Sequence, residues 1–383
     1  MLPPSATVVA TVSDLATLAG LIERVRAAAA SGTLLRICGG GSKDFYGQML
    51  QGELLDTSPL AGVVSYEPSE LVVTVGAGTP LDELEALLAA QGQCLPFEPP
   101  HFGAAAGCRA TVGGMVASGL SGPARASAGA VRDFVLGLNI INGRGEHLTF
   151  GGQVMKNVAG YDVSRLMVGA MGTLGLITEV SLKVLPVAPA EATLRFACNQ
   201  QQALGWLNAW GAQPLPLNAS CWLEDAGAGT LYLRLRGALA AVEAACKTLG
   251  GERKNNANVA FDWQALRDQR LPWFTQRHAD QELWRLSVPQ TAPVLVLPEP
   301  PLVEWHGGLR WVRVSPAQGQ NLRKLAAAAG GHATLFIASN THKTGATARF
   351  DVLKAPLDRI HRELKREFDP AGIFNRGRMY GSW

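Results

Sequence analysis

The most constraining feature of the sequence is a run of three glycines placed directly after a short apolar segment. Residues 34–37 have the composition of a buried strand, and Cys38-Gly39-Gly40-Gly41-Ser42-Lys43 follows without a break. Because glycine has no Cβ, backbone N–H groups in such a loop can converge on an anion, to which Ser42 and Lys43 add a hydroxyl and a positive charge. The pattern predicts a diphosphate site or an ordinary glycine-rich turn. The spacing excludes a Walker A loop.

Two further stretches of small residues lie downstream. Residues 110–119 contain few large side chains, so they would let a flat ligand lie against the backbone, or let two helices pack closely. Residues 154–166 place an Asp and an Arg on a presumed helix, and the glycine-rich residues 169–178 lead from it into a strand. A Rossmann site is only weakly indicated, because Gly76-Ala77-Gly78 is followed by Leu81 where the third glycine would stand.

The first half alternates between helix and strand patterns. Ser13 is expected to cap a helix that Gly32 ends, since the apolar residues between them recur at helical spacing. The segment Thr79-Pro80 predicts the start of another helix, with Thr79 as the cap and Pro80 in the first helical position. Residues 133–141 and 146–150 predict two strands joined by a hairpin turn at Asn142-Gly143.

The pattern changes after Pro186 and Pro189, where we expect a domain boundary. Long glycine motifs disappear, and helix-like segments such as 238–249 alternate with strand-like segments such as 309–314. This alternation is typical of an α+β domain with an antiparallel sheet. Near the end, residues 357–368 predict a charged amphipathic helix.

The composition excludes several classes of protein. With 47% hydrophobic and 17% charged residues and a net charge of +3, neither disorder nor nucleic-acid binding is indicated. Residues 1–5 contain no basic segment before an apolar run, so we expect no secretory signal. The longest uncharged stretch, 196–223, contains four glutamines and two prolines and is not expected to cross a bilayer. The six cysteines form no CxxC pair, which indicates reduced thiols in a cytoplasmic protein.

Taken in order, these segments and several others resemble one family. The chain resembles the FAD-binding subunits of bacterial glycolate oxidase (the GlcE type), within the flavoprotein superfamily of vanillyl-alcohol oxidase and p-cresol methylhydroxylase (PCMH). The resemblance covers nearly the whole chain. It is carried by Leu95-Pro96-Phe97-Glu98-Pro99-Pro100, Thr111-Val112-Gly113-Gly114, and residues 129–137, 155–162, 283–289 and 368–380.

The resemblance implies an α+β fold in three parts. Residues 1–187 would form a two-subdomain, PCMH-type FAD-binding domain, residues 188–360 an α+β cap domain with an antiparallel sheet, and residues 361–383 a segment that returns to the flavin domain. FAD would lie between the two subdomains, with residues 39–43 on the diphosphate. The residues that it implies for the cofactor are Gly39, Gly40, Gly41, Ser42, Lys43, Pro100, Thr111, Gly113, Gly114, Ala117, Ser118, Gly172, Gly175, Ile177 and Asn375.

Two departures from the wider superfamily refine these expectations. Members with covalently bound flavin often carry a His in or near the first glycine loop, whereas residues 36–47 contain none, so we expect FAD to be noncovalent. Cys38 is expected to be a buried thiol and no anchor. Related dehydrogenases carry a His-rich metal motif in the cap, but the seven histidines here form no close pair at metal-ligand spacing, so no metal site is predicted.

Two residues are candidates for catalysis. Arg285 follows Trp284, and its guanidinium is suited to bidentate binding of a substrate carboxylate, although an intersubunit or structural salt bridge is the alternative. His306 stands between Trp305 and Gly307; it is a candidate base for the hydroxyl proton of the substrate, with packing as the alternative.

The implied function is oxidation of glycolate, or a similar D-2-hydroxyacid, to the 2-oxoacid. The resemblance implies two partners, a paralogous flavin subunit and an iron–sulfur subunit, and a cytoplasmic location, either free or on the inner membrane through the complex. One alternative is a subunit that holds flavin or relays electrons without chemistry of its own; a second is a self-sufficient flavin alcohol oxidase. Because no metal-ligand cluster is evident, we expect the isolated chain to reduce its flavin slowly or not at all.

Overall fold

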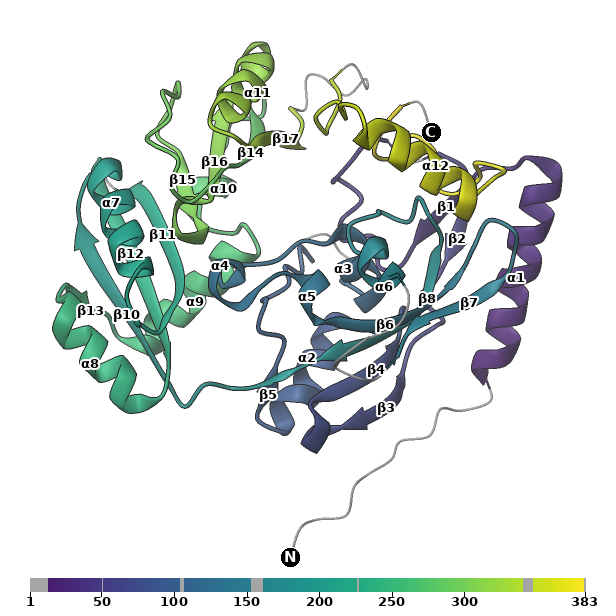
Figure 1. Ribbon diagram of the computed structural model, residues 1–383, viewed down its shortest axis with the longest axis horizontal. Helices are drawn as coiled ribbons and strands as arrows, with labels where there is room; N and C mark the ends of the chain where they lie inside the picture. The colour runs from purple at the N-terminus through teal and green to yellow at the C-terminus, as the bar shows by residue number, and fades with distance from the viewer. Residues whose placement is uncertain are drawn as a thin grey trace, which may run out of the picture.

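The structure is a computed structural model that describes residues 13–49, 51–103, 107–152, 161–225, 227–339 and 347–381. Figure 1 shows two sheet-based parts that lie side by side, with the first half of the chain in purple to teal and the second half mainly in green. The expectations for residues 1–5, 154–160 and His342 lie outside the described residues, as does the side chain of Ser13.

An antiparallel five-stranded sheet forms the centre of the first half. Its strand order is β3-β4-β8-β6-β7, built from β3 (Val63–Glu67), β4 (Val72–Gly76), β8 (Leu176–Lys183), β6 (Val135–Ile141) and β7 (His147–Gly151). Helices α2 (Leu81–Ala90), α3 (Val112–Ser118), α5 (Val131–Phe134) and α6 (Val163–Met167) contribute residues to the apolar core on this sheet. A smaller parallel pair, β1 (Leu35–Cys38) and β2 (Glu53–Asp56), follows helix α1 (Ser13–Ser31). The glycine loop therefore begins at the end of a strand, as its sequence predicts.

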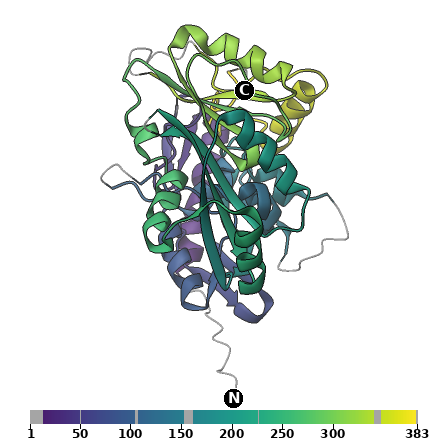
Figure 2. The ribbon, with the colours of Figure 1, turned by 90° about the vertical axis from the view of Figure 1, so that its left-hand side faces the viewer.

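An eight-stranded antiparallel sheet forms the second half, in agreement with the predicted α+β class. Its order is β13-β10-β12-β11-β15-β16-β14-β17, and its strands are β10 (Ala190–Ala197), β11 (Leu217–Asp225), β12 (Ala228–Gly237), β13 (Glu252–Arg253), β14 (Glu282–Ser287), β15 (Leu302–Glu304), β16 (Leu309–Val314) and β17 (His332–Ile337). Apolar residues of α7 (Gln200–Gly211), α8 (Leu239–Leu249) and α11 (Gly319–Ala328) pack on the outer face of this sheet. Figure 2 shows this side of the molecule with α7 and α8 in front of the strands.

The inner face of the same sheet packs against the first half. One apolar cluster joins sheet residues such as Trp311 and Phe336 to Tyr46, Leu120 and Met171 of the first half. Helix α9 (Asn256–Arg267) and the short α10 (Pro272–Thr275) cover the rest of this face. The contact between the halves is therefore a shared core, and it places the glycine loop near the inner face of the sheet.

A buried ion pair lies between the halves. Glu98, which follows β5 (Gln93–Cys94), accepts hydrogen bonds from Arg234 on β12, with Nη2 at 2.6 and 2.7 Å from the two carboxylate oxygens. Arg236 reaches the same carboxylate at 3.3 Å. The two guanidinium charges hold the pKa of the Glu98 carboxyl below its usual value, although burial acts in the opposite direction.

The C-terminal segment returns to the first half. After α12 (Leu357–Phe368), the backbone at Phe374 forms a parallel bridge to Leu35 in β1. The buried Lys365 ammonium donates to Asp369 and to the carbonyls of Thr173 and Phe374 at 2.6 to 2.9 Å. Leu364 and Phe368 of α12 pack against the core of the five-stranded sheet. This anchoring brings residues 373–378 to the glycine loop.

One local prediction, a helix cap, was wrong, and another, the hairpin turn at Asn142-Gly143, was confirmed with a different left-handed residue. Pro80 is the N-cap of α2, one residue later than predicted, because the Thr79 hydroxyl hydrogen-bonds with the backbone of Gly62 and does not cap the helix. The β6–β7 turn uses Gly145, with φ of +70°, as its left-handed residue in place of Gly143. Gly143 has a different reason to be glycine, since a Cβ there would lie 2.5 Å from Asp369 Oδ1.

None of the described helices is long and apolar enough to cross a membrane. All six cysteines are free thiols. The Cys38 thiol lies at the strand end as predicted and donates to the carbonyl of Gly39, but it is half-buried where a buried thiol was expected. Partial burial still raises its pKa.

Candidate functional site

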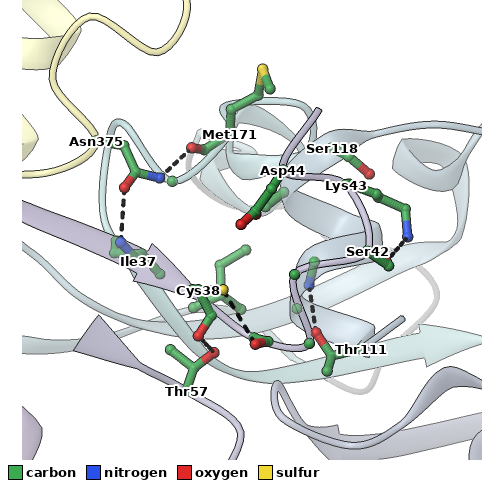
Figure 3. A pocket seen from close by; sticks show the side chains of 18 of the residues that line it. Ile37, Cys38, Ser42, Lys43, Asp44, Thr57, Thr111, Ser118, Met171 and Asn375 are labelled. Atoms are coloured by element: carbon green, nitrogen blue, oxygen red, sulfur yellow. Dashed lines mark hydrogen bonds between the residues drawn. The ribbon is translucent and has the colours of Figure 1, made fainter. Parts of the chain in front are cut away.

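A cavity of about 110 Å³ lies where the glycine loop, α3, the turn before β8 and the C-terminal segment meet. We call it the glycine pocket, and Figure 3 shows it from close by. It brings together every residue that the sequence associates with the cofactor except Pro100. Its walls are Ile37, Cys38, Gly39, Gly40, Gly41, Ser42, Lys43, Asp44, Thr57, Thr111, Gly113, Gly114, Ala117, Ser118, Met171, Gly172, Gly175, Ile177, Asn375 and Arg378.

Several glycines in this pocket let separate segments approach one another closely. A Cβ on Gly40 would lie 1.6 Å from the carbonyl oxygen of Arg109, and one on Gly39 would lie 2.5 Å from Thr111 Oγ1. A Cβ on Gly113 would lie 2.8 Å from that of Ala77. Glycine at these positions is therefore needed for the architecture of the pocket itself. Gly41 differs, since it adopts a φ of +72° and has no atom closer than 3.7 Å.

Asn375 joins three segments of the pocket wall. Its Oδ1 accepts a hydrogen bond from the backbone N–H of Ile37, and its Nδ2 donates to the carbonyl of Met171, both at 2.8 Å. Figure 3 shows the side chain between these two partners. A Cβ on Gly172 would lie 2.6 Å from Asn375 Nδ2, so glycine at 172 makes room for this bridge.

Two cations face the glycine loop. The Lys43 ammonium lies 3.2 Å from Ser42 Oγ, and burial lowers its pKa to about 8. Arg378, which the sequence did not single out, donates to the carbonyls of Lys43, Asp44 and Gln48. Burial lowers the pKa of Arg378 to about 10. The C-terminal segment therefore shapes the loop and adds a second positive charge.

These residues fit an FAD molecule. Lys43, Arg378 and the Ser42 hydroxyl supply the positive charge and a hydrogen-bond donor that a diphosphate requires. Gly113, Gly114 and Ala117 leave a wall of backbone and small side chains for a flat ring. The carboxylate of Asp44 adds an acceptor suited to a sugar hydroxyl. When bound, FAD supplies a two-electron acceptor to its substrate.

A second, smaller cavity of about 30 Å³ lies between the two halves of the chain. We call it the interface pocket. Pro100 lies here and not in the glycine pocket. Its walls are Pro100, Phe102, Leu120, Ser121, Gly122 and Pro123 from the first half and Leu266, Arg267, Gln269, Arg285, Glu304, Trp305, Leu309, Trp311 and Phe336 from the second.

The two pockets are neighbours. Leu120 follows Ser118 of the glycine pocket by two residues, and the Lys43 ammonium lies 5.8 Å from the ring centroid of Phe102. Phe45 makes edge contacts with both Phe102 and Phe336, at centroid distances of 5.3 and 5.4 Å. Lys43 in the glycine loop and the adjacent Phe45 thus contact two residues, Phe102 and Phe336, that line the interface pocket.

Of the two predicted catalytic candidates, Arg285 lines the interface pocket and His306 lines neither pocket. The Arg285 guanidinium lies 5.0 Å from the ring centroid of Trp305, and its positive charge acts on the hydroxyl of Tyr46. Its Nε is buried and has no hydrogen-bond partner within the described part of the chain. No ion pair of Arg285 with an acidic residue occurs among the described residues, so a salt bridge within the chain has no support there, and the intersubunit salt bridge stays a prediction.

His306 is enclosed by two serines. Its Nε2 lies 3.0 Å from Ser127 Oγ and its Nδ1 lies 3.1 Å from Ser220 Oγ. The backbone N–H of His306 also donates to Ser220 Oγ. Burial lowers the pKa of the imidazole to about 4, so it is neutral near pH 7. This environment matches the packing alternative better than a base that contacts substrate.

Glu304 is a candidate that the sequence did not reveal. It lies in the interface pocket, only 4% exposed, and its Oε1 accepts a hydrogen bond from Trp311 Nε1 at 2.7 Å. Burial raises the pKa of this carboxyl to about 8, although the Trp311 hydrogen bond and the charge of Arg285 act in the opposite direction. A lone glutamate in an apolar strand carries no motif, so only the structure identifies it.

Within the described ranges, no three His, Cys, Asp or Glu side chains lie together as a metal site would require. That statement does not extend to residues 340–346, which include His342.

Comparison with known proteins assigns the chain to a class. Residues 9–151 match the FAD binding domain family. The fold is similar to that of alkyldihydroxyacetonephosphate synthase, with a TM-score of 0.63 at 17% identity, over 93% of this chain and 74% of that one. A D-lactate dehydrogenase of Anaerostipes hadrus is 32% identical over 143 residues, which are 37% of this chain and 29% of the relative. The chain is thus a flavoprotein of the PCMH type, an FAD-dependent oxidoreductase.

A longer match defines the family within that class. The glycolate oxidase subunit GlcE of Escherichia coli (strain K12) is 47% identical over 361 residues, which cover 94% of this chain and 96% of the relative. The chain belongs to the GlcE family of glycolate oxidase subunits.

Proposed function

We propose that this chain is the FAD-binding subunit of a complex that oxidises glycolate, or a similar D-2-hydroxyacid, to the 2-oxoacid. The observation that carries the proposal is the 47% identity to a glycolate oxidase subunit over 94% of the chain. The test is to delete the gene in its own host and measure glycolate oxidation in extracts. Restoration by the wild-type chain is expected. Normal glycolate oxidation in the deletion strain would contradict the proposal.

We propose that the glycine pocket holds the FAD. Residues 39–43 would contact the diphosphate, residues 111–118 the flavin and ribityl side, and residues 172–177 the adenosine side, while Asn375 fixes the wall between them. The substitution Gly40→Asp is a poor probe of this placement, because any side chain at 40 collides with the Arg109 carbonyl. Ser42→Ala is a better probe because it leaves the backbone unchanged. It should weaken FAD binding about tenfold, the loss of one charge-assisted hydrogen bond.

FAD binding is proposed to be noncovalent. The loop that contains the three glycines carries no His, and the Cys38 thiol has a raised pKa, so it is a poor nucleophile. Acid precipitation of the FAD-loaded protein should leave all yellow colour in the supernatant. Flavin that stays on the pellet would refute noncovalent binding, while leaving the oxidation itself untouched.

The partners are proposed to be a second, paralogous flavin subunit and an iron–sulfur subunit. A relative of 30% identity over 132 residues is the glycolate oxidase subunit GlcD of Bacillus subtilis (strain 168), which covers 34% of this chain and 27% of that protein. About a third of this chain is therefore related to another kind of glycolate oxidase subunit. Purification under native conditions should recover a second flavoprotein and a Cys-rich iron–sulfur protein. A monomer with full activity would contradict the complex.

A further inference from the structure

We propose that the interface pocket is the substrate site, in which Arg285 binds the substrate carboxylate and Glu304 accepts the proton of the substrate hydroxyl. This inference rests on the proposed function for the identity of the reaction. The structure itself supplies the site: a small cavity whose largely apolar walls include one carboxyl group, Glu304, and two guanidinium groups, of which Arg267 is paired with Asp268 and Arg285 is not paired with an acidic residue of the described chain. It also assigns chemistry to this chain, whereas the sequence led us to expect that the isolated chain reduces its flavin slowly or not at all.

The inner face of the large sheet brings the two residues together. Arg285 on β14 is opposite Trp311 on β16, and Trp311 is in turn opposite Leu302 on β15. Glu304 lies two residues beyond Leu302, so its side chain is on the same face of the sheet. The side chain of Trp311 lies beside both positions and donates its hydrogen bond to Glu304.

The charges in the pocket favour an anion. Arg285 has a buried, unpartnered Nε within the described structure and no acidic partner there. Arg125, on α4 (Arg125–Ala128), lies 4.4 Å from the centroid of the same Trp305 ring that Arg285 contacts. Burial and then the charge of Arg285 lower the pKa of Arg125, as expected for neighbouring cations. A carboxylate would relieve this arrangement by accepting the free N–H.

A strained turn holds the pocket residues in place. Trp305 and His306, directly after Glu304, have φ of +54° and +53°, a conformation that bulky side chains rarely adopt. Trp305 Nε1 donates to the carbonyl of Gly122 in the first half, and His306 lies between its two serines. Strain of this kind persists only where the surroundings enforce it, and it concentrates at functional sites. His306 is thus a positioning residue for the turn.

The size of the cavity limits the substrate. One buried water needs about 10–15 Å³ on this scale, so a cavity of about 30 Å³ accepts a ligand of a few non-hydrogen atoms. Leu309, Trp311 and Phe336 are fully buried walls and leave no room for a large side chain. The site therefore favours two- and three-carbon hydroxyacids over aromatic ones.

The proposed step balances as follows in atoms and electrons. Oxidation of the 2-hydroxyacid breaks its O–H and C2–H bonds and forms a C=O double bond. The hydroxyl proton goes to the Glu304 carboxylate. The electron pair of the C2–H bond, with its proton, goes to FAD, the oxidant that the proposed function supplies. A carboxylate with a pKa near 8 is a stronger base than an ordinary one, although a smaller fraction of it is ionised at pH 7.

The first test measures binding without turnover. Oxalate, an unreactive two-carbon dicarboxylate, is titrated into the FAD-loaded chain and followed by calorimetry and by the visible spectrum of the flavin. Oxalate should bind the wild-type chain, and Arg285→Gln should weaken binding at least about tenfold. The matched control is Arg313→Gln, because Arg313 lies on β16 and stacks on a different tryptophan, Trp273, at 4.6 Å. Absence of oxalate binding, or equal affinities for both variants, would overturn the site.

The second test isolates Glu304. Glu304→Gln keeps the Trp311 partner and should bind oxalate at least as tightly as wild type. In the wild-type complex, flavin reduction by glycolate should rise about tenfold per pH unit up to about pH 8, as the carboxyl ionises. The variant should be slow and lose this rise. The charged or titratable groups that act on Glu304 are Arg285 on β14, Cys221 on β11 and Glu98 from the first half. An unchanged pH profile in Glu304→Gln would overturn its role.

The outcomes separate this inference from the proposed function. If the wild-type complex does not oxidise glycolate, the proposed function fails, while oxalate binding still tests the site. If the complex oxidises glycolate equally well with Arg285→Gln, the site is wrong and the function stands. If Arg285→Gln does not retain FAD, Arg285→Lys is used in its place. Lysine keeps the positive charge but lacks the planar guanidinium that binds a carboxylate in a bidentate way, so oxalate affinity should fall several-fold.

Discussion

Replacement of Asn375 by alanine tests how the C-terminal segment supports the glycine pocket. The side chain is 4% exposed and makes two hydrogen bonds of 2.8 Å, to the N–H of Ile37 and the carbonyl of Met171. Alanine would leave both backbone groups buried without partners, at about 1–3 kcal/mol each. Asn375 also has a φ of +39°, and alanine in the left-handed region costs about 1 kcal/mol more. We therefore expect a loss of about 3–7 kcal/mol.

A loss of this size is a large part of the stability of an ordinary domain, about 5–15 kcal/mol. It should appear as a lower urea midpoint for the FAD-free chain. FAD affinity should fall as well, because Ile37, Met171 and Gly172 all line the pocket that the side chain joins. Fluorescence titration of FAD measures this second effect.

Two variants separate the contributions. Asn375→Gly removes both hydrogen bonds but adopts the positive φ freely, so it should be less destabilised than Asn375→Ala. The control is Asn258→Ala, an exposed asparagine on α9, which should leave both readouts unchanged. If Asn375→Ala unfolds within about 0.5 kcal/mol of wild type, the bridge contributes no more than a surface residue and the reasoning is refuted.

Three further predictions concern charge. FAD affinity should fall above about pH 8, by up to tenfold per pH unit, because the Lys43 ammonium has a pKa of about 8 and only its protonated form attracts the diphosphate. The Lys43→Met variant should bind FAD more weakly, and its affinity should not change with pH in titrations from pH 7 to 9.5. Glu98→Ala should lower the free energy of unfolding, measured with a chemical denaturant, by about 3–5 kcal/mol, because the buried Arg234 guanidinium loses its carboxylate partner. Retention of wild-type stability would mean that water replaces the lost carboxylate. The free energy of unfolding should fall by up to about 3 kcal/mol as the pH is lowered from 6.5 to 4. The reason is that the imidazole of His306 binds a proton at a higher pH in the unfolded chain than in the folded one, where its pKa is about 4. In His306→Asn, this part of the loss of stability at low pH should disappear.

Much of the fold and of the glycine pocket could be predicted from short segments of the sequence. Two segments could be recognised from their glycines, namely the loop after β1 and Thr111-Val112-Gly113-Gly114. Where backbones approach closely only glycine fits, so the need for close approach is recorded in the sequence of each segment. The strands and helices of both halves were predictable for a similar reason, since apolar spacing repeats within each element. The ordered set of motifs then indicated the FAD-binding family, which the match to a GlcE subunit confirmed.

Other features depend on which segments meet, and no local pattern records that. Thr79 has the sequence of a helix cap, yet its hydroxyl bonds to Gly62, a residue seventeen positions away that the sheet brings near. Arg378 reaches the glycine loop only because α12 and the Lys365–Asp369 pair anchor the C-terminal segment.

Glu304 is the clearest case. In sequence it is a single acidic residue after Leu302-Val303, with no catalytic motif around it. Antiparallel register places it on the inner face of the sheet, and burial there raises its pKa to about 8. The sequence by itself therefore determined the cofactor, because binding FAD constrains neighbouring residues. Only the tertiary structure decided that the carboxyl and guanidinium of the interface pocket lie together, because β14 and β15 must both pair with β16 before these groups meet.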